Sequence, residues 1–234
     1  FCMAFLSMLA GATLAPNETK ADWPAFLGGD SREAAAGFKP PLTWTAEEGI
    51  GWQVPLPGHG QSSPVIIEDR IYVTAVEGPK KNNNLILCHS LSDGTLLWKR
   101  SYPSSLPVEN NVYTSRAAPT PAADQTGVFT FFESGNLIAL NGKGEVRWER
   151  DLIKDYGKYI GRFGLGGSVA QTDDSVIIVA DNDGPSYIAA FDKGTGKTLW
   201  KTDRPSRISW SSPMSPTERA SRNATSFATP IPKS

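Results

Sequence analysis

The 234-residue sequence predicts an all-β protein built from short antiparallel strands. Its 22 glycines and 18 prolines are scattered along the chain, which favours many strands and turns and leaves little room for helices. One hairpin pattern, an apolar strand followed by a glycine turn and a second strand, occurs three times. Each copy has a tryptophan four residues after a glycine: Gly94 and Trp98, Gly144 and Trp148, and Gly196 and Trp200. These tryptophans are 50 and 52 residues apart, a period typical of β-propeller blades.

The glycine and the tryptophan of each copy have separate physical reasons. A three- to five-residue hairpin loop usually needs a positive φ, which costs a residue with a Cβ atom about 1–2 kcal/mol. A lone two-stranded ribbon cannot bury an indole, so we expect each tryptophan to pack between neighbouring blades. Each burial removes about 200 Å² from water, so we expect Trp148→Ala or Trp200→Ala to cost roughly 3–5 kcal/mol.

The repeat divides residues 22–214 into successive blades of four antiparallel strands. The predicted blades cover about 62–101, 118–151 and 167–202. Residues 211–214 repeat the opening of the first blade, which predicts the start of a fourth blade and an incomplete ring. Trp52 lies in a predicted strand, 51–56, without a hairpin before it, and we expect this strand to form the outer edge of a last blade.

The two ends of the chain differ in composition from the repeats. Residues 1–15 are apolar and contain an A-G-A cleavage pattern, which is typical of a secretory signal too short to span a bilayer. This predicts a periplasmic or secreted protein with no transmembrane segment after signal removal. Residues 215–234 are rich in Ser, Thr, Pro and Ala, so we predict a disordered tail. The change indicates a truncated reading of a longer gene or a natural tail.

Composition argues against several functional classes. The net charge of −1 lacks the positive excess with which proteins bind nucleic acid. Cys2 lies in the leader and Cys88 in a predicted core strand, so these two cysteines form neither a disulfide framework nor a cysteine-rich metal site. A site built on the two histidines, His59 and His89, would also need a converging carboxylate, and we predict no metal site.

Two short motifs favour structural interpretations over chemical ones. The glycine cluster at 161–167 lacks the phosphate-loop spacing and a following helix, which favours a tight turn into a strand. Residues 181–184, D-N-D-G, resemble part of a calcium loop but lack its later glutamate, which favours a turn. No serine lies in the glycine elbow of a catalytic triad, and we predict no catalytic residues.

The hairpin from Phe191 to Trp200 resembles the A-x-D-x-x-T-G-x-x-x-W repeat of the PQQ-like β-propeller proteins. That superfamily includes BamB-type outer-membrane assembly lipoproteins and quinoprotein alcohol dehydrogenases. Residues 22–26, 62–65 and 182–186 are similar to exported PQQ-like propellers of Planctomycetes. The resemblance implies seven or eight radial blades in a full ring, with each indole packed between blades. The first two blades lack the Thr-Gly pair and keep the glycine-to-tryptophan spacing.

The same resemblance bears on cofactors. Quinoprotein dehydrogenases hold PQQ beside a Ca²⁺, with an Asp as general base and a ring formed by adjacent cysteines. This sequence has no adjacent cysteine pair, and the metal-binding Glu and Asn cannot be mapped onto it. We therefore predict no cofactor here and leave PQQ and Ca²⁺ to a full-length parent.

Surface function is predicted for the loops that lead into each inner strand, because these loops gather at one mouth of a propeller channel. The candidate ligand-binding residues are His59, Gln61, Tyr113, Arg116, Arg162 and Trp210. Arginine and aromatic side chains are common hot spots for a peptide or small ligand. Ordinary solvated loop residues are the plainer interpretation.

We predict an exported, non-catalytic binding or scaffold module for a protein or small ligand. Two alternatives stay open: a fragment of a PQQ-dependent quinoprotein dehydrogenase, and a non-functional truncated product. Three blades leave two bare sheet edges, which predicts self-association with other copies.

Overall fold

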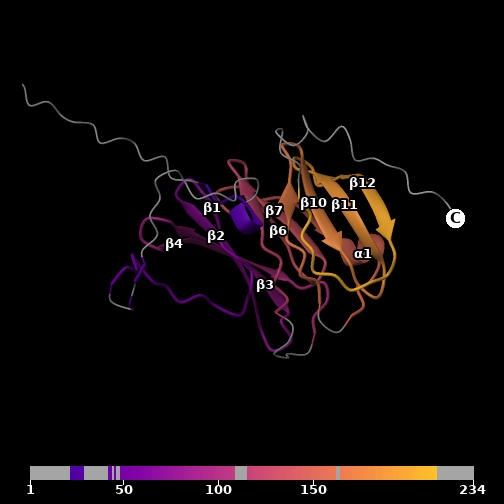
Figure 1. Ribbon diagram of the computed structural model, residues 1–234, viewed down its shortest axis with the longest axis horizontal. Helices are drawn as coiled ribbons and strands as arrows, with labels where there is room; N and C mark the ends of the chain where they lie inside the picture. Colours follow the sequence, from indigo (N-terminus) through magenta and orange to yellow (C-terminus); the bar gives the residue numbers. More distant parts are fainter. Residues whose placement is uncertain are drawn as a thin grey trace, which may run out of the picture.

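The computed structural model describes residues 22–28, 42–43, 45, 48–108, 115–161 and 164–214. Within them the chain forms three four-stranded antiparallel sheets that follow one another along the sequence (Figure 1). Each sheet is one blade of a β-propeller, and the described blades do not close into a ring. The predicted all-β class and the four-stranded blades are confirmed.

Each blade is a meander in which neighbouring strands in the sequence pair with each other. The first blade contains β1 (Val65–Ile67), β2 (Arg70–Glu77), β3 (Asn83–Ser90) and β4 (Leu96–Pro103). The second contains β5 (Ala122–Asp124), β6 (Gly127–Phe131), β7 (Asn136–Leu140) and β8 (Val146–Asp151). The third contains β9 (Ala170–Gln171), β10 (Ser175–Ala180), β11 (Ser186–Asp192) and β12 (Thr198–Arg204).

Two short helices accompany the sheets. The 3₁₀ turn η1 (Phe26–Gly28) precedes the first blade, and α1 (Leu152–Tyr156) follows β8. Asp151 caps α1, because its side chain accepts hydrogen bonds from the amides of Ile153 and Lys154. In the described ranges, no helix has the length and apolar character needed to cross a membrane.

The last hairpin of each blade repeats the same irregularity. The register between the third and fourth strands shifts between Cys88 and His89, between Ala139 and Leu140, and between Ala190 and Phe191. The turn that follows has its glycine at positive φ: 74° at Gly94, 74° at Gly144 and 71° at Gly196. The predicted conformational role of these glycines is therefore confirmed.

The first and second blades meet where Trp98 packs on the hairpin of Gly144. A Cβ atom at Gly144 would lie only 2.7 Å from the indole ring, so the glycine also permits the close approach of the two blades. The indole Nε1 donates a hydrogen bond to the Gly142 carbonyl at 3.0 Å, and Trp98 is 9% exposed. An arginine strengthens this junction, because Arg100 Nε donates to the Gly144 carbonyl at 2.7 Å.

The second and third blades meet in the same way. Trp148 is 8% exposed and packs on Gly196, where a Cβ atom would lie 2.6 Å from the ring. Its Nε1 donates to the Lys193 carbonyl at 2.8 Å. Arg150 donates to the Gly196 carbonyl at 2.6 Å and lies 5.4 Å from the centre of the Phe191 ring. Each buried tryptophan thus contacts the turn of the blade that follows it.

Trp52 takes the equivalent place on the first blade. Its indole packs on Gly94, where a Cβ atom would lie 2.6 Å away, and its Nε1 donates to the Leu91 carbonyl at 3.0 Å. The strand predicted over 51–56 is wrong, because these residues form no ladder with any strand that the structure describes. A strand is stable only when a neighbouring strand satisfies its backbone hydrogen bonds. The contact of Trp52 with Gly94 needs no such neighbour.

Trp200 departs from the expected burial between blades. It is 45% exposed, so the prediction that it packs like Trp148 is wrong for the described structure. The reason is the direction of the contact: each indole covers the turn of the following blade, and no described blade follows the third.

The apolar core occupies the spaces between the blades. Between the first two blades it includes Ile86 and Cys88 of β3 with Val128 and Leu140, all fully buried. Burial raises the pKa of the Cys88 thiol to about 12, so this cysteine acts as a packing residue. A larger cluster joins the second and third blades around Phe129, Trp148 and Phe191.

The difference between the two indoles predicts unequal effects of truncation. Trp148→Ala should lower the free energy of unfolding by about 3–5 kcal/mol, because it removes a buried ring and leaves a cavity. Trp200→Ala should cost less than about 1 kcal/mol, because the ring is half exposed. Urea denaturation followed by circular dichroism measures both values, and equal losses would contradict the assigned contacts.

Candidate ligand-binding site

A chain of hydroxyl contacts joins the starts of the successive blades. The Ser63 amide donates to Thr120 Oγ1 at 3.0 Å, and the Thr120 amide donates to Ser168 Oγ at 3.1 Å. The Ser168 amide then donates to Ser212 Oγ at 2.9 Å, in the segment after β12. The loops that precede the first strands are therefore held side by side at one end of the blades.

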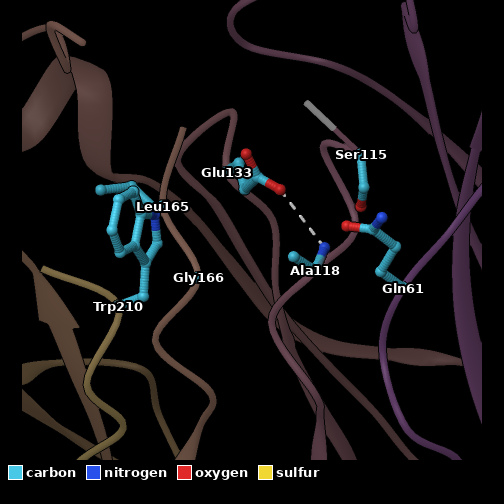
Figure 2. A pocket seen from close by; sticks show the side chains of 7 residues that line it. All are labelled: Gln61, Ser115, Ala118, Glu133, Leu165, Gly166 and Trp210. Carbon is cyan, nitrogen blue, oxygen red and sulfur yellow. Dashed lines mark hydrogen bonds between the residues drawn. The ribbon is translucent and has the colours of Figure 1, made fainter. Parts of the chain in front are cut away.

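A pocket of about 330 Å³ opens where these loops meet (Figure 2). Its lining residues are Gln61, Ser115, Ala118, Glu133, Leu165, Gly166 and Trp210. They come from the segments before β1, β5 and β9, from the loop after β6 and from the segment after β12. Figure 2 shows Trp210 and Leu165 on one side, with Gln61 and Ser115 across from them and Glu133 between.

Glu133 is the buried acid of this pocket. The residue is 1% exposed, and its Oε1 accepts a hydrogen bond from the Ala118 amide at 3.3 Å. Its Oε2 accepts no hydrogen bond from the residues that the structure describes. Burial raises the pKa of Glu133 to about 7, although the charge of Arg116 and the nearby amides, including that of Leu165, lower it.

Two cations lie within electrostatic reach of this carboxyl group. Arg116 has a positive φ of 67°, and its NH1 donates to the main-chain carbonyl of Glu133 at 3.4 Å. Lys81 is 4% exposed, and burial lowers its pKa while the charge of Glu133 raises it. Burial likewise lowers the pKa of Arg116, and Glu133 opposes that change. The carboxyl group therefore sits in a desolvated cluster of mixed charge.

Two glycines of the 161–167 cluster make room for pocket side chains. Gly164 has a φ of 72°, and a Cβ atom there would lie 1.8 Å from Glu133 Oε2. At Gly166 a Cβ atom would lie 2.8 Å from the Trp210 ring, so the indole packs directly on that backbone. Trp210 nevertheless stays 55% exposed. The glycines thus place an acid and an aromatic ring on the pocket wall.

The structure brings some of the predicted site residues together. Gln61 and Trp210 line the pocket, and Arg116 lies beside Glu133 without lining it. His59 is exposed, lies outside the lining and pairs through its main chain with β2. Tyr113 and Arg162 lie outside the described residues. A binding role for any of these residues stays a prediction.

Sequence reasoning missed Glu133, which the structure places at the centre of the pocket. The repeat pattern gives this residue no site role, and in the structure it lies in the loop after β6, which ends at Phe131. A carboxylate directly after Phe131 and Phe132, both fully buried, was the available signal, because a charged side chain in such a stretch has to be desolvated.

The D-N-D-G segment forms a turn. The fully buried Asp181 carboxylate accepts hydrogen bonds from Arg204 at 2.7 and 3.1 Å and from Arg207 at 3.3 Å. Asn182 Oδ1 accepts from the Gly184 amide at 2.7 Å. Across the described part of the chain, no three His, Cys, Asp or Glu side chains gather in a way that could hold a metal ion.

Glu133 should make thermal stability depend on pH near neutrality. A carboxyl group whose pKa rises on folding from 4.5 to about 7 adds stability that is complete below about pH 4.5 and is lost as the pH rises through 7. We expect the Tm to fall between about pH 5 and pH 8, and Glu133→Gln to remove most of this fall. Calorimetry measures the Tm at each pH, with Glu149→Gln, at an exposed position, as the control. If the Tm of the parent and of E133Q changes with pH in the same way, the assignment to Glu133 is contradicted.

Known structures share the fold at low sequence identity. The quinohemoprotein alcohol dehydrogenase of Comamonas testosteroni matches with a TM-score of 0.50 and 20% identity, over 80% of this chain and 28% of that protein. BamB of Moraxella catarrhalis matches with 0.45 and 19%, over 65% of this chain and 43% of that one. The dehydrogenase ADHIIG of Pseudomonas putida HK5 matches with 0.48 and 20%, over 66% and 22%. The chain thus spans less than half the length of each.

The sequence itself identifies the family. Comparison with curated proteins gives no match. A family model described as outer membrane protein assembly factor BamB matches residues 42–160, which are 119 of the 234 residues. This range contains the first two blades, their two tryptophan hairpins and the glutamate of the pocket. The chain therefore belongs to the BamB family of PQQ-like β-propeller repeat proteins.

Proposed function

We propose that this chain is an exported, non-catalytic binding module that takes a protein segment or a small ligand at the pocket around Glu133 and Trp210. Membership in a family described as an outer membrane protein assembly factor supports a role in contacts with other proteins. The same description supports the cell envelope as the site of action. The signal-like composition of residues 1–15, which lie outside the described residues, agrees with export.

One observation carries the proposal: the pocket joins an exposed indole to a buried acid and to polar side chains. Such a combination of an aromatic surface with a few placed polar groups is typical of ligand sites. Among the lining residues, Ser115 has a structural role. Its Oγ accepts a hydrogen bond from the Ala117 amide at 3.0 Å, and a serine bonded in this way stabilises its own loop. Because the lining comes from loops of all three blades, ligand contact depends on how the blades are joined.

Site-specific photo-crosslinking tests the binding role. A photoreactive phenylalanine in place of Gln61, at the pocket, should give defined adducts with envelope proteins or peptides. The same residue in place of Leu97, on the exposed edge strand β4, is the matched control. Trp210→Ala should remove the Gln61 adducts while the unfolding curve stays within about 1 kcal/mol of the parent, because the ring is exposed. Equal adducts from both positions, insensitive to Trp210→Ala, would refute a specific site.

PQQ-dependent alcohol oxidation is the second candidate, and the fold shared with the Comamonas testosteroni enzyme favours it. A non-catalytic binding module needs no cofactor. Titration with PQQ and Ca²⁺ should therefore give no turnover in a dye-linked alcohol assay. Absorbance spectra recorded in the same titration report on cofactor binding. Tight binding accompanied by turnover would replace the binding module with a dehydrogenase.

A further inference from the structure

We propose that the pocket binds an organic ammonium group, such as a lysine side chain or another primary amine, between the Glu133 carboxylate and the Trp210 indole. This inference rests on the proposed function as a binding module and names the chemistry of its ligand. Figure 2 shows the two side chains at the same pocket, with Glu133 between Trp210 on one side and Gln61 and Ser115 on the other.

The charge of the pocket wall supports a cationic ligand. Among the described lining residues, Glu133 is the one with an ionisable side chain, and the others are polar, apolar or aromatic. One of its oxygens is bonded to the Ala118 amide, while Oε2 lies against Gly164, is buried and has no hydrogen-bond partner among the described residues. A buried acceptor without a partner is costly, so a ligand that donates hydrogen bonds to it gains both a contact and relief of that cost.

The indole supports an ammonium group on an apolar stem. Trp210 packs on the Gly166 backbone, which positions the ring, and more than half of its surface remains accessible. A cation beside an aromatic face is attracted by the negative charge of the ring system, and tryptophan is the strongest such partner. The methylene chain of a lysine or alkylamine would lie along the exposed indole, beside the buried Leu165 that lines the same side of the pocket.

Among the described residues, Arg116 and Lys81 are the cations that interact electrostatically with Glu133, and both oppose a third cation. Neither belongs to the lining, and Arg116 NH1 donates to the main-chain carbonyl of Glu133. Their charges make an acidic ligand the competing choice. A cationic, a neutral and an acidic side chain in one peptide frame distinguish these choices.

Ionisation of Glu133 gives the binding a distinct pH dependence. Burial raises the pKa of Glu133 to about 7, so the carboxylate forms as the pH rises through neutrality. A lysine amine, with a pKa of about 10.4, keeps its proton across this range. Affinity for the amine should therefore increase between about pH 6 and pH 8.5, and affinity for a neutral analogue should not.

Isothermal titration with three acetylated, amidated tripeptides tests the proposal. They carry lysine, norleucine or glutamate between two alanines, so they differ only in the central side chain. At about pH 8.5 we expect the lysine peptide to bind at least about tenfold more tightly than the norleucine peptide, as a charge-assisted contact implies. The preference should shrink at about pH 6. Equal affinities, tighter binding of the glutamate peptide, or no binding of the lysine peptide would overturn the inference.

Variants assign the effect to the two side chains. Glu133→Gln keeps the shape and an acceptor for the Ala118 amide, and it should abolish both the preference for lysine and its pH dependence. Glu149→Gln, on the exposed face of β8, should change neither. Trp210→Leu should weaken the lysine peptide more than the norleucine peptide. If the lysine and norleucine peptides bind equally and Trp210→Leu weakens both, the ammonium ligand is wrong and the binding module stands. The module itself fails if the Gln61 and Leu97 positions give equal photoadducts that are insensitive to Trp210→Ala.

If Glu133→Gln does not fold, the pH series on the parent protein still decides the question. A lysine preference that is the same at about pH 6 and pH 8.5 would exclude Glu133 as the group that recognises the amine.

Discussion

The contact of an indole with the glycine of the next turn is the interaction on which the rest of this structure depends. A single four-stranded sheet cannot bury both of its faces, so each blade is stable only against a neighbour. The ring of Trp98 or Trp148 fills the space above a residue without a side chain and donates a hydrogen bond to the turn. The contact of one indole with one glycine therefore sets the distance between two neighbouring blades, their alignment and the order in which they follow each other.

Most of the fold could be predicted from the sequence because its repeat is carried by residues with strict local demands. At Gly144 the positive φ was predictable from the hairpin turn alone. Its contact with Trp98 was not, because the sequence does not say whether an indole packs on the preceding or the following blade. The direction of that contact explains why Trp200 was predicted wrongly and Trp148 was not. Trp52 was predicted in a strand over 51–56, yet its position depends on the indole contact and not on strand pairing.

The pocket was less predictable than the blades. Propeller geometry places the loops before the first strands together, which is why Gln61 and Trp210 could be anticipated. Glu133 could not be assigned in this way, because it follows β6, and its place in the pocket depends on tertiary contacts with Gly164 and the Ala118 amide. Its importance comes from desolvation and from the cations around it, and both are tertiary properties.

The hydroxyl chain through Ser63, Thr120, Ser168 and Ser212 has an evolutionary consequence. Every step joins a main-chain amide in the segment before one blade to a hydroxyl in the corresponding segment about fifty residues further on, which for the last step is the segment after β12. Duplicating or deleting a whole unit during evolution leaves the remaining steps chemically unchanged. Such interchangeable connections allow a gene to gain or lose units of about fifty residues while its product keeps one architecture.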